Sequence, residues 1–311
     1  MYVVVSRPLY GADVYGEWFV FYLVSAEYTP SLMAFALGSL SDAIGRRRVM
    51  SVSIMGAFFI FMLFQIENWI FKIVFVFLYS FTHTLAITIG LSYVIEDRAN
   101  VGRKYSKVGV ASGLGWGIGS LIAWPLLSLL SMSGFPSFVS IMYATGIIFL
   151  ITGYSGKERE QAQAIMKGLS STINNLRSLI PIILLSYIGL TIGGTYNSIL
   201  MDKKITAIIN NSLDATHRRF LYGVLYGFLP VLAGTPLRPF IGRIVDYGKA
   251  REAFLAALLS YLILFVVLPF TPPLIFFLLW ILPVYPFFDT SLYAMVSRGT
   301  TGYEASVSGF L

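Results

Sequence analysis

The sequence predicts an all-α polytopic membrane protein, and two observations carry this prediction: the composition and the spacing of apolar stretches. Hydrophobic residues make up 57% of the chain and charged residues only 12%, with a mean hydropathy of +0.76. An ordinary soluble domain contains about 25% charged residues. Apolar stretches of about 20 residues recur along the chain, and a helix of that length crosses a bilayer core of about 30 Å.

Nine of the apolar stretches are long enough to be complete spans, and shorter segments lie at both ends. Residues 2–12 would cover only about 17 Å as a helix, and residues 299–311 are predicted to be a loop followed by the first turns of another helix. The polar pair Glu67-Asn68 predicts a tight link between two spans. The predicted complete spans are residues 17–40, 49–66, 70–94, 108–130, 135–154, 178–200, 220–241, 252–270 and 273–296.

Two longer polar segments interrupt this pattern. Residues 155–177 are rich in charged and amide side chains and contain no long apolar stretch, so we expect a central linker there. Residues 201–219 carry four basic side chains and are predicted to be an added segment outside the membrane, on the opposite side from the linker. These basic residues are Lys203, Lys204, Arg218 and Arg219.

A charged turn lies between the first two complete spans. Residues 38–48 have the sequence GSLSDAIGRRR, in which two glycines allow close helix approach and unusual backbone angles. A weaker copy, GRIVDYGKAR, occupies residues 242–251. In both copies an aspartate follows the first glycine by four residues, and another glycine and basic residues come next. A simple loop that obeys the positive-inside rule would also explain the arginines.

The first copy resembles the loop 2–3 signature of the major facilitator superfamily, G-x-L-x-D-x-x-G-R-[RK], and the second resembles its degenerate counterpart in loop 8–9. Ala43 stands where family members often carry arginine, and the second copy is one residue short. The resemblance implies a fold of two helical bundles, with a partial first helix, nine complete spans and a partial eleventh helix. It predicts bundles over residues 1–154 and 178–311, joined by the linker over residues 155–177.

Basic residues in short loops predict the orientation of the spans, because such loops remain in the cytoplasm. Placing both glycine turns and the central linker in the cytoplasm also places most of the other lysines and arginines there. We therefore expect a multi-pass protein of the cell membrane, acting as a monomer. The net charge of +7 is explained by these loops and does not predict nucleic-acid binding.

The resemblance implies that the two glycine turns form a cytoplasmic gate. We expect the Asp42 carboxylate to lie at the N-terminus of a helix that begins near Gly302, where the helix dipole favours negative charge. Arg46 or Arg47 would then pair with Glu96 or Asp97. The predicted gate residues are Gly38, Asp42, Gly45, Arg46, Arg47, Glu96, Asp97, Arg98, Gly242, Arg243, Asp246 and Gly248.

Ionisable residues inside predicted spans are the first candidates for solute or ion binding, because a charge in hydrocarbon costs at least about 2.5 kcal/mol. Glu27 and Asp289 lie well inside their spans, and either could carry a coupling proton. Of the two, Glu27 is the better candidate for lining a central cavity, because its helix also carries the first glycine turn. Alternatively, each carboxylate could bond to backbone freed by a nearby proline. Arg7 could hold an anionic solute or be solvated outside the membrane. Tyr196, Asn197 and Tyr285 could contact a polar solute.

A glycine stripe, Gly109, Gly113 and Gly117, recurs at every fourth residue of the span over residues 108–130. Small residues at this spacing let two helices approach closely in a membrane. The stripe also resembles the glycine-rich fifth-helix motif of proton-linked drug antiporters, although the Gly-Pro pair of that motif is absent. We therefore expect these glycines to serve helix packing.

These features predict a secondary transporter of a small solute that works by alternating access. No nucleotide-binding motif is present, so an ion gradient, with the proton favoured, would supply the energy. The chain has two histidines and no cysteine, which argues against a metal site, and we expect no cofactor. No nucleophile and base pattern predicts an enzyme. A shortened, non-transporting member of the same family is the alternative, and the sequence does not single out a solute.

Overall fold

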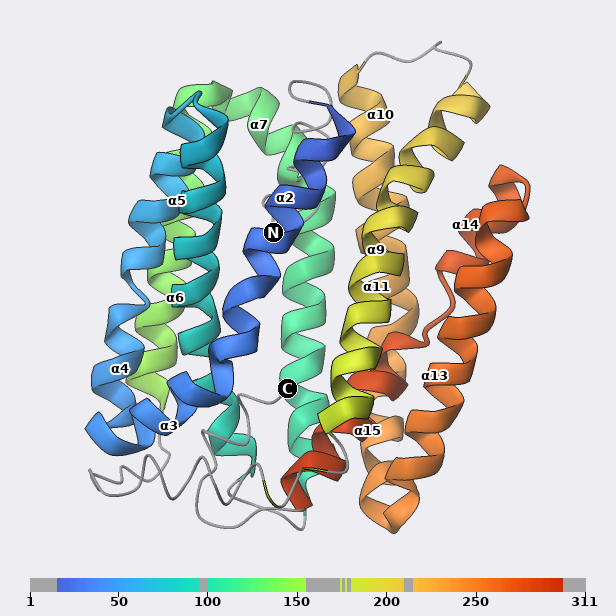
Figure 1. The fold of residues 1–311 in the computed structure, drawn as a ribbon. Helices are drawn as coiled ribbons and strands as arrows, with labels where there is room; N and C mark the ends of the chain where they lie inside the picture. The colour runs from blue at the N-terminus through green and yellow to red at the C-terminus, as the bar shows by residue number, and fades with distance from the viewer. Residues whose placement is uncertain are drawn as a thin grey trace. The chain divides into compact units, whose positions relative to one another are not determined.

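The computed structural model describes residues 16–95, 100–154, 174, 177, 180–209 and 215–298, and within these ranges all regular structure is helical (Figure 1). The all-α prediction is thereby confirmed for the described part of the chain. The longer elements are α2 (Glu17–Tyr28), α3 (Ala34–Ile44), α4 (Arg46–Val52), α5 (Met55–Gln65), α6 (Trp69–Ile95), α7 (Val101–Gly153), α9 (Ile180–Ile209), α10 (Ala215–Tyr222), α11 (Leu229–Gly234), α12 (Arg238–Ile244), α13 (Ala250–Val267), α14 (Pro273–Trp280) and α15 (Tyr285–Arg298).

Short turns of other helical types join several of these elements. The 3-10 turn η1 (Thr29–Met33) connects α2 to α3, and η4 (Thr235–Leu237) connects α11 to α12. Two π-helical segments, η3 (Gly223–Phe228) and η5 (Val245–Lys249), flank the same region. A further 3-10 turn, η6 (Leu268–Phe270), ends α13. Most of these turns contain or adjoin proline or glycine, which is where helices break or change pitch.

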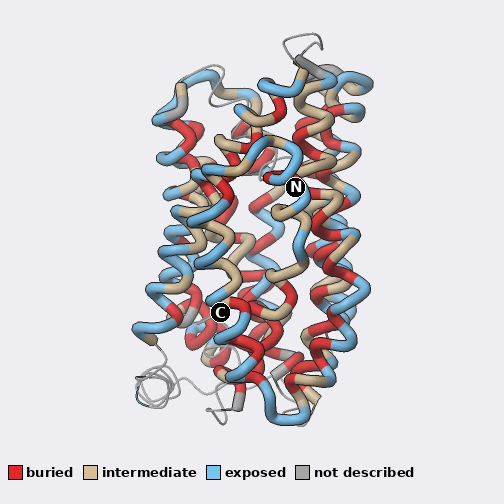
Figure 2. Tube along the Cα trace, turned by 90° about the vertical axis from the view of Figure 1, so that its right-hand side faces the viewer, coloured by how far each residue is buried: buried red, intermediate tan, exposed pale blue. Residues whose placement is uncertain are grey.

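Seven helical segments of the described chain are long and apolar enough to cross a membrane, and a bent pair, Trp18–Met33 with Ala36–Ile44, would make an eighth. Within the seven, only 17% to 39% of the residues in the most apolar window are buried. Figure 2 shows exposed and buried residues alternating along these helices. The exposed faces are mostly apolar and suit contact with lipid.

Two helical stretches are longer than one membrane span. The helix α7 includes two of the seven segments, Val101–Leu130 and Gly134–Gly153. The segment His217–Phe270 has 54 residues, about 81 Å as a helix and more than twice the thickness of a bilayer core. It is kinked at Gly248, where φ is 94°.

The described parts of the segment 201–219, which was predicted to lie outside the membrane, are helical. The helix α9 continues to Ile209, and α10 begins at Ala215. Met201 and Ile205 lie one turn apart on a buried face of α9, with 0% and 2% of their surfaces exposed. Lys204 projects from another face and donates from Nζ to the carbonyl oxygen of Thr271 at 2.6 Å. The charged side chains lower the mean hydropathy of this segment, so hydropathy alone does not predict its buried helical face.

The chain divides into two compact units that do not follow sequence order. The first unit contains Met1–Val20, Gly102–Leu129 and Ile182–Ala294. The second unit contains Phe21–Val101, Leu130–Pro181 and Met295–Leu311. The predicted division into bundles at residue 154 stays a prediction. Each unit has its own buried core and is described by itself.

The core of the first unit joins α9 to the helices of the second half of the chain. Its fully buried cluster contains Met201 and Ile205 of α9, Tyr222 of α10, Leu268 of η6, and Phe276 and Phe277 of α14. Trp116, Tyr226 and Trp280 pack against this cluster. Aromatic rings therefore dominate the packing around which the candidate site is built.

The core of the second unit is organised around α6, which contacts η1, α3, α4 and α5. Figure 1 shows α5 and α6 side by side. The predicted link before α6 is a helix cap, because Oδ1 of Asn68 accepts from the backbone N–H of Ile70 at 2.9 Å. Pro30 interrupts the first predicted span at η1, and nearby the hydroxyl of Ser80 on α6 donates to the carbonyl of Glu27. A neighbouring helix thus satisfies backbone polar groups near the proline.

Candidate functional site

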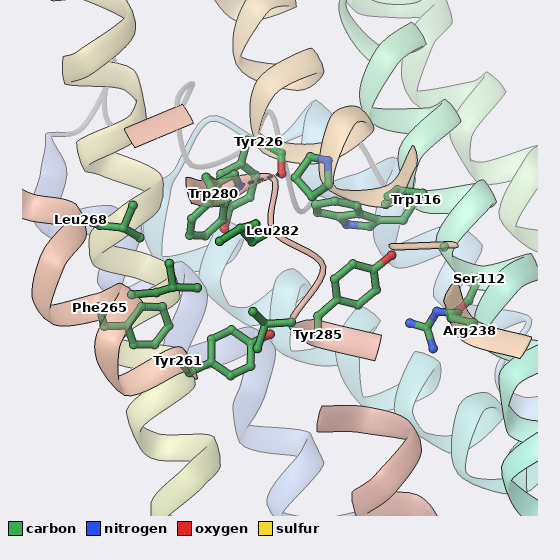
Figure 3. A pocket seen from close by; sticks show the side chains of 15 residues that line it. Ser112, Trp116, Tyr226, Arg238, Tyr261, Phe265, Leu268, Trp280, Leu282 and Tyr285 are labelled. Atoms are coloured by element: carbon green, nitrogen blue, oxygen red, sulfur yellow. Dashed lines mark hydrogen bonds between the residues drawn. The ribbon is translucent and has the colours of Figure 1, made fainter. Parts of the chain in front are cut away.

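The first unit contains a cavity of about 430 Å³ (Figure 3), a volume within the usual range for small-molecule sites. Its walls are mainly aromatic and aliphatic side chains, and they carry a single charged group, Arg238. Figure 3 shows Arg238 beside Tyr285 at one end, with Leu268 and Phe265 at the other. The lining residues are Ser112, Gly113, Trp116, Tyr226, Pro230, Val231, Arg238, Tyr261, Leu264, Phe265, Leu268, Trp280, Leu282, Val284 and Tyr285.

The helix that was predicted over residues 273–296 is interrupted beside this cavity. The helix α14 ends at Trp280 and α15 begins at Tyr285, and the irregular backbone between them contains Pro283. Leu282 and Val284 of this break lie on the cavity wall. Irregular backbone at membrane depth is tolerated only where it is buried in protein or lines a cavity. The break between α14 and α15 therefore forms part of the cavity wall.

A second proline lies near the same part of the cavity wall. Pro230 has no backbone N–H to donate to the carbonyl of Tyr226, which lies four residues earlier in the π-helical segment η3. The indole Nε1 of Trp280 donates to that carbonyl at 3.2 Å. The rings of Tyr226 and Trp280 also stack, with centroids 5.1 Å apart and an interplanar angle of 21°. This bond and this stack fix an aromatic wall next to the helix break.

Arg238 forms a partly buried ion pair at the polar end of the cavity. Its Nη2 donates to Oδ2 of Asp289 on α15 at 2.8 Å, and 4% of its side chain and 29% of the Asp289 side chain are exposed. Its guanidinium carbon lies 5.0 Å from the centre of the Tyr285 ring. Among the described residues, Nε and Nη1 of Arg238 have no hydrogen-bond partner. A buried cation with unused donors is costly unless a further acceptor binds there.

The predicted glycine stripe on α7 faces the segment that carries Arg238. A Cβ atom on Gly117 would lie 2.9 Å from Cγ1 of Val231, and one on Gly113 would lie 3.2 Å from Oγ1 of Thr235. A Cβ on Gly109 would overlap Nη1 of Arg238. The three glycines therefore lie where the neighbouring helix approaches closely, and Gly109 leaves room for the guanidinium.

The second glycine turn packs against the start of α7 in the same unit. Oδ1 of Asp246 accepts from the N–H of Gly102 at 2.8 Å, and Oδ2 accepts from the N–H of Arg103 at 3.0 Å. Ser106 donates to the carbonyl of Arg238 at 2.7 Å. Gly242 lies in this contact and Gly248 forms the kink at φ 94°, whereas the side chain of Arg243 is exposed.

The first glycine turn forms a buried cluster in the second unit. Nε of Arg46 donates to Oδ1 of Asp42, and Nη1 donates to Oη of Tyr154 at 3.1 Å. Arg47 donates from Nη2 to the carbonyl of Tyr154 at 2.6 Å. Gly38 is buried in α3, and Gly45 takes φ 109° between α3 and α4. The turn thus ties the α3–α4 corner to the residue that follows α7.

The other predicted residues are distributed as follows. Asn197 of α9 is 1% exposed and Tyr196 beside it is 49% exposed, and neither lines the cavity. Glu27 is half-buried on α2 in the second unit. Arg7, Glu96, Asp97 and Arg98, and the helix expected to begin near Gly302, lie outside the described residues.

Comparison with known proteins decides the family. The model of the Major Facilitator Superfamily matches residues 10–311. The chain belongs to this superfamily of membrane transporters. A solved structure of the human organic anion transporter MFSD10 (TETRAN) matches with a TM-score of 0.69 at 17% identity, covering 98% of this chain and 80% of that one. A search of curated proteins gives no match.

Arg238 was not among the residues predicted from the sequence of this superfamily member. The residue lies inside the predicted span over residues 220–241, where any arginine is a candidate for function. Its position near the predicted end of that span made it look like part of the following loop. The signal was available, because Pro236 and Pro239 flank it within an apolar run. Asp289, its partner, was among the predicted solute or ion residues.

Proposed function

We propose that this protein is a secondary active transporter that moves a small solute across the cell membrane by alternating access. Membership of the Major Facilitator Superfamily supports membrane transport as the general activity. The observation that carries the proposal for this chain is the cavity in the first unit, which has an interrupted helix in its wall and a partly buried ion pair at one end. Interrupted helices are where membrane transporters commonly build their solute and ion sites.

The proposed architecture has nine complete spans. Seven segments are long and apolar enough to cross a membrane. Counting the bent pair as one further span, and the 54-residue segment as two spans divided at Gly248, supports nine. In this proposal the bundles cover residues 1–154 and 178–311. Both glycine turns and the central linker face the cytoplasm, where basic loops are retained.

In the proposed transport cycle the glycine turns hold the cytoplasmic side closed. Asp42 with Arg46, and Asp246 with the start of α7, are the contacts that support this role. We expect Asp42→Asn to shift the population toward inward-open states. The chain has no cysteine, so a single cysteine placed in a cytoplasmic loop can report accessibility without further engineering. Unchanged labelling in Asp42→Asn would contradict the gate.

Asp289 is the proposed coupling residue, with the proton as the coupling ion. It lies in the second turn of α15 and accepts a hydrogen bond from Arg238, so a proton on its carboxylate would release the arginine. Glu27 is the second candidate, although the described contacts of its backbone with Ser80 suit a packing role as well. A coupled cycle predicts that an imposed pH gradient drives accumulation of the solute.

The test is uptake by purified protein in proteoliposomes, measured for a panel of solutes with and without a pH gradient. We expect saturable uptake of at least one solute, faster when the outside is acidic. A double variant that fills the cavity, Gly113→Leu with Val231→Phe, should abolish that uptake, whereas Gly146→Leu on the exposed face of α7 should not. Failure of every solute to enter would favour the non-transporting alternative.

A further inference from the structure

The cavity has one cationic end in an otherwise apolar wall. Arg238 and Ser112 lie at the same end, and the rings of Trp116, Tyr226 and Trp280 lie along the walls. Such a surface suits a solute with one polar group and a flat apolar body, because aromatic rings prefer offset stacked or edge-to-face contacts with other rings. A sugar or a polyol would leave most of its hydroxyl groups without partners here.

The free donors of Arg238 indicate the chemistry of the polar group. Asp289 accepts a single hydrogen bond, from Nη2 of Arg238. Nε and Nη1 of Arg238 have no hydrogen-bond partner among the described residues. A guanidinium binds a carboxylate most strongly through two parallel hydrogen bonds. A solute carboxylate that engages two nitrogens of Arg238 would therefore compete well with the single bond to Asp289.

Charge balance then requires a proton. The pair of Arg238 and Asp289 is neutral as it stands, and a bound carboxylate would add one negative charge to an apolar site, which is costly. Protonation of Asp289 restores neutrality. The charged and titratable groups near Asp289 in the described chain are Arg238 on α12, Tyr105 on α7, Tyr261 on α13 and Tyr285 on its own helix. None of the three phenols supplies a second positive charge.

We infer that the cavity binds the monoanion of an aromatic carboxylic acid together with one proton. On binding, the hydrogen bond from Nη2 of Arg238 to Oδ2 of Asp289 breaks, one proton from solvent bonds to the Asp289 carboxylate, and the solute carboxylate takes the guanidinium. Any role of this site in transport rests on the proposed function. The inference itself concerns binding, and the experiment below measures binding.

The test is isothermal titration calorimetry of the purified full chain in detergent with 1-naphthoate. Titrations at one pH in two buffers of different ionisation enthalpy count the protons taken up with the ligand. We expect saturable binding with about one proton taken up per anion. The neutral analogue 1-naphthylmethanol should bind more weakly and without proton uptake, and the cation 1-naphthylmethylammonium should not bind.

Variants separate the two roles. Arg238→Gln should weaken 1-naphthoate binding at least tenfold and leave 1-naphthylmethanol unaffected. Asp289→Asn, which keeps the shape of the side chain, should bind 1-naphthoate at least as tightly as the native protein and take up no proton. Arg251→Gln and Glu252→Gln change the same side-chain types at exposed positions of α13, and both should behave like the native protein.

Each contrary result overturns the inference. No saturable binding of 1-naphthoate or benzoate to folded protein, equal binding of the cation, or no proton uptake by the native chain would each do so. If Arg238→Gln does not fold, the proton counts for native protein and Asp289→Asn still decide. Binding with the expected proton but no uptake into proteoliposomes would refute the proposed transport alone. Uptake of a neutral solute unaffected by Asp289→Asn would refute this inference alone.

Discussion

The two glycine turns share a sequence pattern and a glycine at positive φ, but their aspartates have different partners. The glycines that follow the aspartates, Gly45 and Gly248, both have positive φ, 109° and 94°. Asp42 of the first turn pairs with Arg46 of the same turn. Asp246 of the second turn instead accepts two backbone N–H groups at the start of α7. The shared sequence pattern therefore predicts the turn, but it does not predict the partner of the aspartate.

The two arrangements differ in how they stabilise the fold. The pair of Asp42 and Arg46 is almost fully buried, with 6% and 1% of the side chains exposed, so each charge depends on the other. Asp246 is 8% exposed and caps a helix N-terminus, where free N–H groups and the helix dipole favour a carboxylate. Removing one member of the buried pair should therefore be more harmful than removing the cap.

The largest effect is expected for Asp42→Ala. The change leaves the Arg46 guanidinium buried without its carboxylate, and loss of one partner from a buried pair typically costs about 3–5 kcal/mol. We expect a decrease of this size in the free energy of unfolding, measured by denaturant titration in mixed micelles. The double variant Asp42→Ala with Arg46→Met should recover part of the loss. A loss below about 1 kcal/mol would show that the pair is solvated.

The next effect is expected for Gly242→Ala in the second turn. The added Cβ would overlap Oγ of Ser106 and lie 2.6 Å from the carbonyl oxygen of Gly102, so the two segments must separate. Overpacking of this kind costs about 1–3 kcal/mol. The same substitution at Gly146, whose Cβ would meet nothing within 4 Å, serves as the control and should be neutral or stabilising.

Thermal unfolding of both glycine variants in one detergent measures the difference. Equal melting temperatures would mean that α7 and the second turn do not pack as closely as the contacts of Gly242 and Ser106 indicate.

Membrane-length helices and both turns could be predicted because their signals are local. Apolar length and the polar pair Glu67-Asn68 depend on residues next to one another, and so does the need for glycine at positive φ. The partner of Asp246 could not be predicted, because it lies 144 residues away at the start of α7. The residues next to a loop do not show which helix N-terminus will pack against it.

The site was harder to predict for the same reason. Asp289 could be predicted because it is an acid inside a predicted span. The role of Arg238 depends on the approach of α15 and on the space left by Gly109, and the sequence shows neither. The buried face of Met201 and Ile205 was hidden by the charged residues between them. The break after Trp280 contains a proline, yet proline alone does not tell a kink from an unwound segment that lines a cavity.

A moderate effect is expected for Asp246→Ala. The variant removes the acceptor for the N–H groups of Gly102 and Arg103, and loss of a helix cap costs about 0.5–2 kcal/mol. Unfolding in mixed micelles should show a loss within this range, smaller than that of Asp42→Ala. Asp246→Asn keeps one side-chain acceptor and should lose less than alanine does. A loss equal to that of Asp42→Ala would mean that the second turn also depends on a buried charge pair.

The smallest effect is expected for Arg103→Gln. The Arg103 side chain is 49% exposed, and its Nε lies 3.8 Å from Oδ2 of Asp246, so this ion pair is a surface contact. Such pairs contribute about 0–1 kcal/mol and weaken with added salt. The backbone N–H of residue 103 still donates to Asp246 in this variant. The difference between Asp246→Ala and Arg103→Gln therefore measures the cap alone, and it should persist at high salt. If it disappears in salt, the carboxylate acts through Arg103, and the two glycine turns both rely on an arginine after all.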